Sequence, residues 1–187
     1  MAKTALILID LQNDYFPGGR WALEGIDAAA GKAARLLEAA RRSGDLVIHV
    51  HHEFESSDAP FFTPGSEGAR IHHSVQPIDG ELQVLKHKVN AFQGTDLKTI
   101  LEERGIETLV VCGAMSHMCI DGAVRAASDF GFAVTLIHDA CATRDQEFGG
   151  TTVPAAQAHA AFMSALGFAY ANVISADDYL ATVAKAA

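Results

Sequence analysis

The sequence predicts a single α/β domain, spanning residues 1–187, in which a mainly parallel, doubly wound sheet lies between two helical layers. Three observations predict this fold. Strand-like segments alternate along the chain with Ala-rich segments of helical spacing. The strand-like segments are apolar at nearly every position, which is typical of strands covered on both faces. Apolar residues make up 49% of the chain, enough for a sizeable core in one domain of ordinary size.

Four segments have the character of buried strands: 4–10, 45–50, 107–113 and 132–140. Shorter strands are expected within 82–88 and 168–176. Because helical segments separate these strands, crossover connections rather than hairpins should join them, and the strands should run parallel.

The helical segments are 25–44, 95–105, 119–131, 153–167 and 177–187. The first three close at Gly44, Gly105 and Gly131, and glycine is common just past a helix end. Thr95 is the expected N-cap of the second helix, because its hydroxyl can accept a free N–H of the first turn.

Residues 51–80 break the alternation of strands and helices. The segment has no periodicity and contains Pro60, Pro64 and Pro77. A loop of this length inside a compact domain is usually functional. The same expectation holds, more weakly, for residues 11–25.

Charge and composition exclude several classes of protein. The formal net charge is -9 and no basic cluster is present, so neither nucleic acid nor a membrane is an expected partner. The apolar run before Asp10 is only five residues long (Ala5 to Ile9), too short for a signal peptide, and the protein is therefore expected to be cytoplasmic. Three cysteines without a C-x-x-C spacing do not predict a disulfide framework or a zinc site.

Three chemically useful residue types follow predicted strands. Asp10 closes the first strand, Lys86 or Lys88 closes the short one, and Cys119 follows the strand that ends at Gly113. Ligands of open parallel sheets bind outside the carboxyl ends of the strands, so these side chains could converge there. For Asp10 the alternative is a helix cap, and for the lysines it is a solvated edge. Spacing alone does not choose between Lys86 and Lys88.

Cys119 is expected in the first turn of a helix, where the helix dipole and free N–H groups favour a thiolate. A nearby lysine would favour it further. The alternative is a small buried apolar residue, which is the usual role of a lone cysteine. Cys112, inside an apolar strand, should be core, and Cys141 should be inert although it lies at the same sheet edge.

Histidines cluster at His49, His51 and His52, with two more at His72 and His73. Imidazoles are common metal ligands, but no accompanying carboxylate or cysteine spacing completes a recognisable set. Polar lining of the long loop, or contact with another subunit, explains the cluster equally well. No metal and no cofactor are therefore predicted.

The stretches "ALILIDLQNDYFPGG", "VLKHKVNAF" and "CGAMSHMCID", in this order, resemble the isochorismatase-like cysteine hydrolase superfamily. The resemblance runs from about residue 4 to 175. It implies the same Rossmann-type three-layer fold. Members include nicotinamidases, N-carbamoylsarcosine amidohydrolase, ureidoacrylate and biuret hydrolases, streptothricin hydrolase, and isochorismatase itself.

The resemblance implies a catalytic triad of Asp10 as general base, Lys86, and Cys119 as nucleophile. It selects Lys86 over Lys88 because the family lysine lies six residues before an aromatic, here Phe92. It also implies a cis peptide between Ala114 and Met115, with an oxyanion hole made by the N–H groups of Met115 and Cys119. The substrate pocket candidates are Phe16, Trp21, Phe61, Phe62 and His117.

Two departures from the family pattern bear on the reaction. Nicotinamidases bind a metal through an Asp-x-His and a later His, but His52 and Phe54 stand at the first two of those positions here. Members that hydrolyse isochorismate, a vinyl ether, lack the cysteine that this chain has. Cys119 therefore favours cleavage of a C–N bond.

The sequence thus predicts a hydrolase of a small carboxamide or carbamoyl substrate that acts through a thioester acyl-enzyme. The resemblance also implies a homo-oligomer, either a dimer or a tetramer. One alternative is an isochorismatase-type vinyl ether hydrolase. Another is a non-catalytic small-metabolite binding protein in which Cys119 senses redox state.

Overall fold

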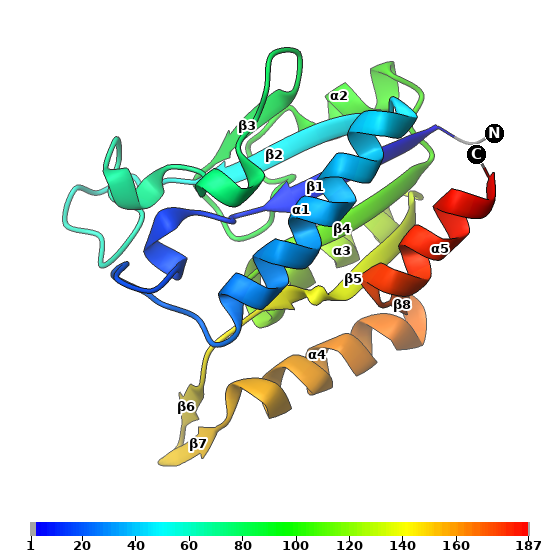
Figure 1. Cartoon of the computed structure of the whole chain (residues 1–187). Coiled ribbons are helices and arrows are strands. Elements are labelled where there is room, and N and C mark those ends of the chain that lie inside the picture. The colour runs from blue at the N-terminus through cyan, green and yellow to red at the C-terminus, as the bar shows by residue number, and fades with distance from the viewer. Residues whose placement is uncertain (1–2, 187) are drawn as a thin grey trace.

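The computed structural model describes residues 3–186, and within them six parallel strands form one sheet in the order β3-β2-β1-β4-β5-β8 (Figure 1). The strands are β1 (Thr4–Ile9), β2 (Leu46–His52), β3 (Leu82–Lys86), β4 (Thr108–Ala114), β5 (Ala133–Ala142) and β8 (Asn172–Ile174). The predicted parallel α/β fold is confirmed.

Two helical layers enclose the sheet, each with its own apolar core. The helices are α1 (Ile26–Ser43), α2 (Leu97–Glu103), α3 (Asp121–Asp129), α4 (Ala155–Ala169) and α5 (Ala176–Ala186). Helices α1 and α5 pack on one face, and α2, α3 and α4 contribute to the core of the other. In β1, Leu6 and Leu8 face the α1 side whereas Ile7 and Ile9 face the opposite side, because successive side chains of a strand alternate.

The strand order reverses beside β1, which has β2 on one side and β4 on the other. In doubly wound sheets the crevice at such a reversal is the usual ligand site. Here the two central strands approach each other closely: Gly113 has φ 129°, and a Cβ on it would lie 2.0 Å from the carbonyl oxygen of Ile9. Only glycine fits at this position.

Several element boundaries differ from those expected. Helix α2 begins at Leu97 with Asp96 as N-cap, although the hydroxyl of Thr95 still accepts the N–H of Leu97 (3.3 Å). Strand β2 extends through His52, and two 3-10 turns, Glu67–Ala69 and His73–Val75, order part of the long loop. The two turns are held by short-range hydrogen bonds, in which the side chains of Ser66 and His72 accept the N–H groups of Ala69 and Ser74, and such bonds leave no periodic pattern in the sequence.

An antiparallel hairpin, β6 (Gln146–Phe148) and β7 (Thr151–Val153), was absent from the sequence expectation. Figure 1 shows it projecting from the body of the molecule, before α4. Its strands are only three residues long and carry no apolar alternation, so pattern analysis has little to detect. Phe148 at its tip is 86% exposed.

No helix among residues 3–186 combines the length and apolar character needed to cross a bilayer.

Glu81, just before β3, joins three parts of the fold. Its carboxylate accepts two hydrogen bonds from Arg41 of α1 (2.7 and 2.9 Å) and one from the N–H of Ile78 (3.0 Å), and it contacts His49 Nε2 of β2 (2.9 Å). Burial acts to raise the pKa of Glu81, but Arg41, Ile78 and His49 outweigh it and lower the pKa to about 2. The network holds β3 against β2, where β3 ends at Lys86.

Replacing Glu81 by Gln should lower the free energy of unfolding by about 2 kcal/mol at pH 7. Because the pKa is depressed in the folded state, this contribution is complete above the ordinary value of 4.5 and is lost as the pH falls toward 2. Urea unfolding of both proteins between pH 7 and pH 3 measures the difference. A difference that grows on acidification would contradict the role given to Glu81.

Candidate active site

The carboxyl ends of three strands bring Asp10, Lys86 and Cys119 into one buried cluster. Lys86 Nζ lies 2.8 Å from Asp10 Oδ2 and 3.3 Å from Cys119 Sγ. Asp10 and Lys86 are fully buried, and Cys119 is 5% exposed. Lys88, the other lysine that spacing allowed, is exposed and pairs with Glu55 (3.5 Å). The structure therefore brings together the same three residues that the resemblance selected.

Asp10 stands immediately after β1, at φ 52°. Few residues other than glycine adopt this left-handed conformation, and Asp and Asn do so most readily. Its N–H donates to the carbonyl of Val50 in β2 (2.9 Å), which fixes the turn. Among the described residues its Oδ1 has no hydrogen-bond partner, so this oxygen is free to accept a proton.

Cys119 lies in a π-helical turn, Ser116–Ile120, between β4 and α3. The expectation placed it in the first turn of an α-helix, but α3 begins only at Asp121. The Ala114–Met115 peptide is cis. The carbonyl of Met115 accepts the N–H groups of Met118 (3.0 Å) and Ile120 (3.2 Å), whereas the N–H of Met115 has no acceptor among residues 3–186. That N–H remains available to a ligand.

The pKa of the Cys119 thiol is raised above its ordinary value. Burial raises its pKa, the carboxylate of Asp10 raises it further, and Lys86 only partly offsets both. The sequence predicts a thiolate favoured by a helix N-terminus, and burial of the sulfur acts against that form. Burial alone would lower the pKa of Lys86, but Asp10 and Cys119 raise it overall, so the amine stays charged.

Gln12 anchors the strand end next to this cluster. Its Nε2 donates to the carbonyl oxygens of His52 (2.8 Å) and Ala69 (2.7 Å), and its Oε1 accepts the N–H of His52 (2.8 Å). One buried amide therefore holds the end of β2 and the long loop in a fixed relation to β1.

Asp14 fixes a second point of the same loop. It accepts the backbone N–H groups of Phe62 (2.7 Å) and Arg20 (3.1 Å), and a Cβ on Gly68 would lie 2.2 Å from its Oδ1. Sequence analysis assigned no role to Gln12 or Asp14. The only feature of the sequence that could have indicated a role is their spacing, two and four residues after Asp10, because both side chains act through contacts with distant residues.

Part of the expected substrate pocket gathers beside the cluster. Trp21 stacks on Phe61 (ring centroids 4.8 Å apart), and Phe61 packs edge-on against Phe62 (4.9 Å). Tyr15, which sequence analysis did not select, packs on Phe62 (4.5 Å). Burial raises the pKa of the Tyr15 hydroxyl, and the acidic groups Cys119, Asp10 and Asp14 act in the same direction.

The other two pocket candidates have different surroundings. Phe16 stacks on His72 at 3.5 Å and lines a separate surface hollow. His117 Nδ1 lies 2.7 Å from the hydroxyl of Thr143, after β5. Neither contact involves the aromatic group around Phe61.

With this geometry established, the family can be assigned from comparison. The isochorismatase domain matches residues 4–178. The chain belongs to the isochorismatase family.

Several family members are closely similar to this chain. An isochorismatase family protein of Bacillus subtilis, YddQ, which is uncharacterised, is 47% identical over 95% of this chain and 98% of its own. Streptothricin hydrolase of Streptomyces noursei is 36% identical over 87% of this chain and 59% of its own. The crystal structure of an isochorismatase-type hydrolase from Oleispira antarctica superimposes with a TM-score of 0.93 and 57% identity, covering 96% of each chain.

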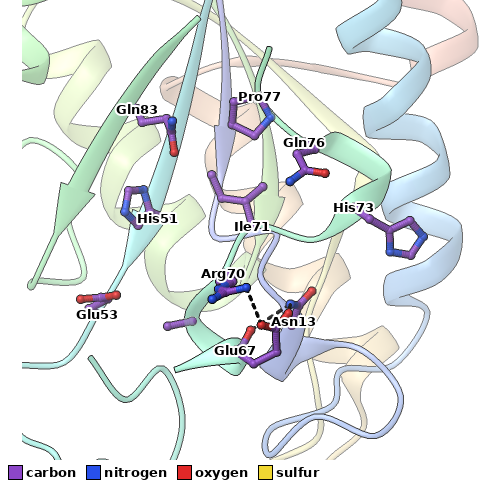
Figure 2. A pocket seen from close by; sticks show the side chains of 11 residues that line it. Asn13, His51, Glu53, Glu67, Arg70, Ile71, His73, Gln76, Pro77 and Gln83 are labelled. Atoms are coloured by element: carbon purple, nitrogen blue, oxygen red, sulfur yellow. Dashed lines mark hydrogen bonds and ion pairs between the residues drawn. The ribbon is translucent and has the colours of Figure 1, made fainter. Parts of the chain in front are cut away.

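In this isochorismatase-family chain the three clustered histidines each have different neighbours. His49 contacts Glu81, and His52 Nδ1 lies 2.8 Å from Lys86 Nζ. His51 lines a polar cavity of about 580 Å³ with Gln83 and residues of the long loop (Figure 2). The histidines therefore do not converge on one point.

One group of side chains has a spacing that could hold a metal ion. Ligand atoms of Asp10, His52 and Cys119 lie within 4.8 Å of one another. The ammonium of Lys86 contacts all three, at 2.8, 2.8 and 3.3 Å, so a positive charge already occupies their centre. The ammonium of Lys86 therefore provides the positive charge that a metal ion would provide at this place.

Replacing Lys86 by Met should lower the free energy of unfolding by about 3 kcal/mol, because it leaves the Asp10 carboxylate buried without a counter-charge. Adding Asp10→Asn to that variant should recover part of the loss. Urea unfolding of the single and double variants tests both statements. Lys88→Met, at an exposed position, is the control and should change stability by about 0.5 kcal/mol or less. A Lys86→Met protein as stable as the wild type would contradict the ion pair.

Proposed function

We propose that this chain is a cysteine-dependent hydrolase that cleaves C–N bonds in small carboxamide or carbamoyl compounds through a thioester acyl-enzyme. One observation carries the proposal: a buried lysine ammonium joins a carboxylate and a thiol at the crevice where the strand order reverses. A nucleophile, a proton acceptor and a fixed positive charge are the parts that acyl transfer through sulfur requires.

In the first half-reaction Asp10 takes the proton of the thiol while Cys119 Sγ attacks the carbonyl carbon of the substrate. The C–S bond forms as the carbonyl electron pair moves to oxygen, and the N–H groups of Met115 and Cys119 stabilise the oxyanion. The C–N bond then breaks, and Asp10 passes its proton to the leaving nitrogen. Ammonia or an amine departs, and the acyl group remains on sulfur.

In the second half-reaction Asp10 removes a proton from water as the water oxygen attacks the thioester carbonyl. The C–S bond breaks, and the proton returns to Sγ. The acid product leaves, and the thiol is restored. Lys86 stays protonated throughout and stabilises the negative charge as it moves between Asp10 and sulfur.

The raised pKa of the Cys119 thiol supports proton transfer that is coupled to attack. Because the pKa of Cys119 is raised, a free thiolate would be costly before the substrate arrives. The oxygen of Asp10 without a partner is suited to receive the proton. Isochorismate hydrolysis needs no acyl-sulfur intermediate, so a thiol within reach of both charged groups favours the amide reaction.

The proposal also includes a cytoplasmic homo-oligomer, with aromatic residues of a neighbouring subunit completing the pocket. Phe148 and Phe168 support such contacts, since they are 86% and 92% exposed and phenylalanine is enriched at subunit interfaces.

The wild-type protein should release ammonia from at least one compound in a panel of small amides, carbamoyl compounds and ureas. Cys119→Ala should reduce turnover by a factor of about 1000 or more, because the covalent route is lost. Mass spectrometry of the protein quenched during turnover should show the acyl group on Cys119. Full activity of Cys119→Ala would refute the proposal, and turnover of isochorismate by that variant would favour ether hydrolysis.

A further inference from the structure

His52 contacts Lys86 in the site, but the proposed reaction gives it no role. It is the last residue of β2 and pairs in register with Lys86 of β3. The residue is only 6% exposed, and Gln12 forms hydrogen bonds with both its N–H and its carbonyl. The imidazole therefore has a fixed position beside the ammonium.

The contact with Lys86 determines where the ring carries its proton. Nδ1 of His52 lies 2.8 Å from Lys86 Nζ, and an ammonium is a donor only, so Nδ1 must accept and the proton must sit on Nε2. Burial lowers the pKa of His52 to about 4, and the charge of Lys86 adds to the effect. Asp10 of β1 opposes it, while His87 and Lys88 after β3 reinforce it. The ring is neutral at pH 7.

Lys86 in turn depends on this acceptor. Its Nζ has four neighbours within hydrogen-bond distance: Asp10, His52, the carbonyl of Lys88 (3.2 Å) and Cys119. The two shortest contacts, both 2.8 Å, are to Asp10 and His52. These two partners hold the ammonium from different strands at the distance that leaves it 3.3 Å from the sulfur.

The other ring nitrogen of His52 has no such partner. Its Nε2 is buried and lacks a hydrogen-bond partner among the described residues. The ring lies near Phe54 and Phe62, with centroids 4.6 and 6.2 Å away, which cannot accept a conventional hydrogen bond. An unsatisfied buried N–H is costly, and such groups in native sites commonly await a ligand.

We propose that His52 is a positioning residue for Lys86 through Nδ1 and a specificity residue through Nε2–H, which donates to an acceptor oxygen of the substrate. The second role rests on the proposed amide hydrolysis. It narrows the substrate to small amides that carry a further carbonyl or carboxylate oxygen near the scissile carbonyl. A substrate with an ammonium in place of that oxygen is disfavoured, because the ammonium and the Nε2–H of His52 are both hydrogen-bond donors.

The positioning role is tested by the rate at which iodoacetamide alkylates Cys119, a reaction that needs no turnover. His52→Asn keeps an oxygen near the position of Nδ1, whereas His52→Gln and His52→Leu remove the acceptor there. Alkylation should slow about 10-fold in the Gln and Leu variants and clearly less in His52→Asn. Peptide mass spectrometry assigns the label to Cys119. Equal rates in the wild type and His52→Leu would overturn the positioning role.

His51→Asn is the matched control for these variants. His51 is the neighbouring residue of the same strand, but it lines the polar cavity of Figure 2, and the hydrogen bond to Lys86 comes from His52 instead. Its alkylation rate should equal that of the wild type. A slowing as large as that of His52→Leu would show a general disturbance of β2 and overturn the assignment to His52.

The specificity role is tested on the amide that the wild type hydrolyses best. His52→Asn, which lacks the Nε2 donor, should raise KM about 10-fold with a smaller change in kcat. An unchanged KM would overturn the donor role and leave the proposed function standing. Absence of turnover by the wild type on every compound would overturn the donor role together with the proposed function, while the alkylation rates would still decide the positioning role.

Discussion

A lysine with no exposure to water is the constraint around which this structure is arranged. The ammonium of Lys86 would be costly to bury alone, and Asp10 supplies the charge that makes its burial tolerable. His52 and the carbonyl of Lys88 satisfy other protons of the same group. Cys119 then lies next to a positive charge that solvent does not screen, which is the condition for stabilising a transient thiolate.

The doubly wound topology brings these groups together although they lie far apart in the sequence. β1, β2 and β3 each end at the same edge of the sheet, and each contributes one member of the set: Asp10, His52 and Lys86. The turn after β4, which is the neighbour of β1 on the side opposite β2, contributes the sulfur of Cys119. The glycine at position 113 permits the close approach of β4 to β1 on which that meeting depends.

The sequence predicts the sheet well because strands buried on both faces are recorded directly as apolar runs. It predicts the buried polar cluster only in part: position at strand ends suggested Asp10 and Cys119, and resemblance was needed to separate Lys86 from Lys88. The raised pKa of the thiol could not be foreseen, because it depends on burial and on charges far along the chain. The roles of Gln12 and Asp14 were equally hidden, since each acts on backbone about 40 to 60 residues away.

The raised pKa of Cys119 has a consequence for the life of the protein in an oxidising cell. Peroxides react with thiolates far faster than with thiols, and sulfinic and sulfonic acids form irreversibly. A sulfur that is almost sealed from solvent, and whose pKa burial raises, gives such oxidants little to attack. The burial that raises the pKa of Cys119 thus also shields its sulfur from oxidants.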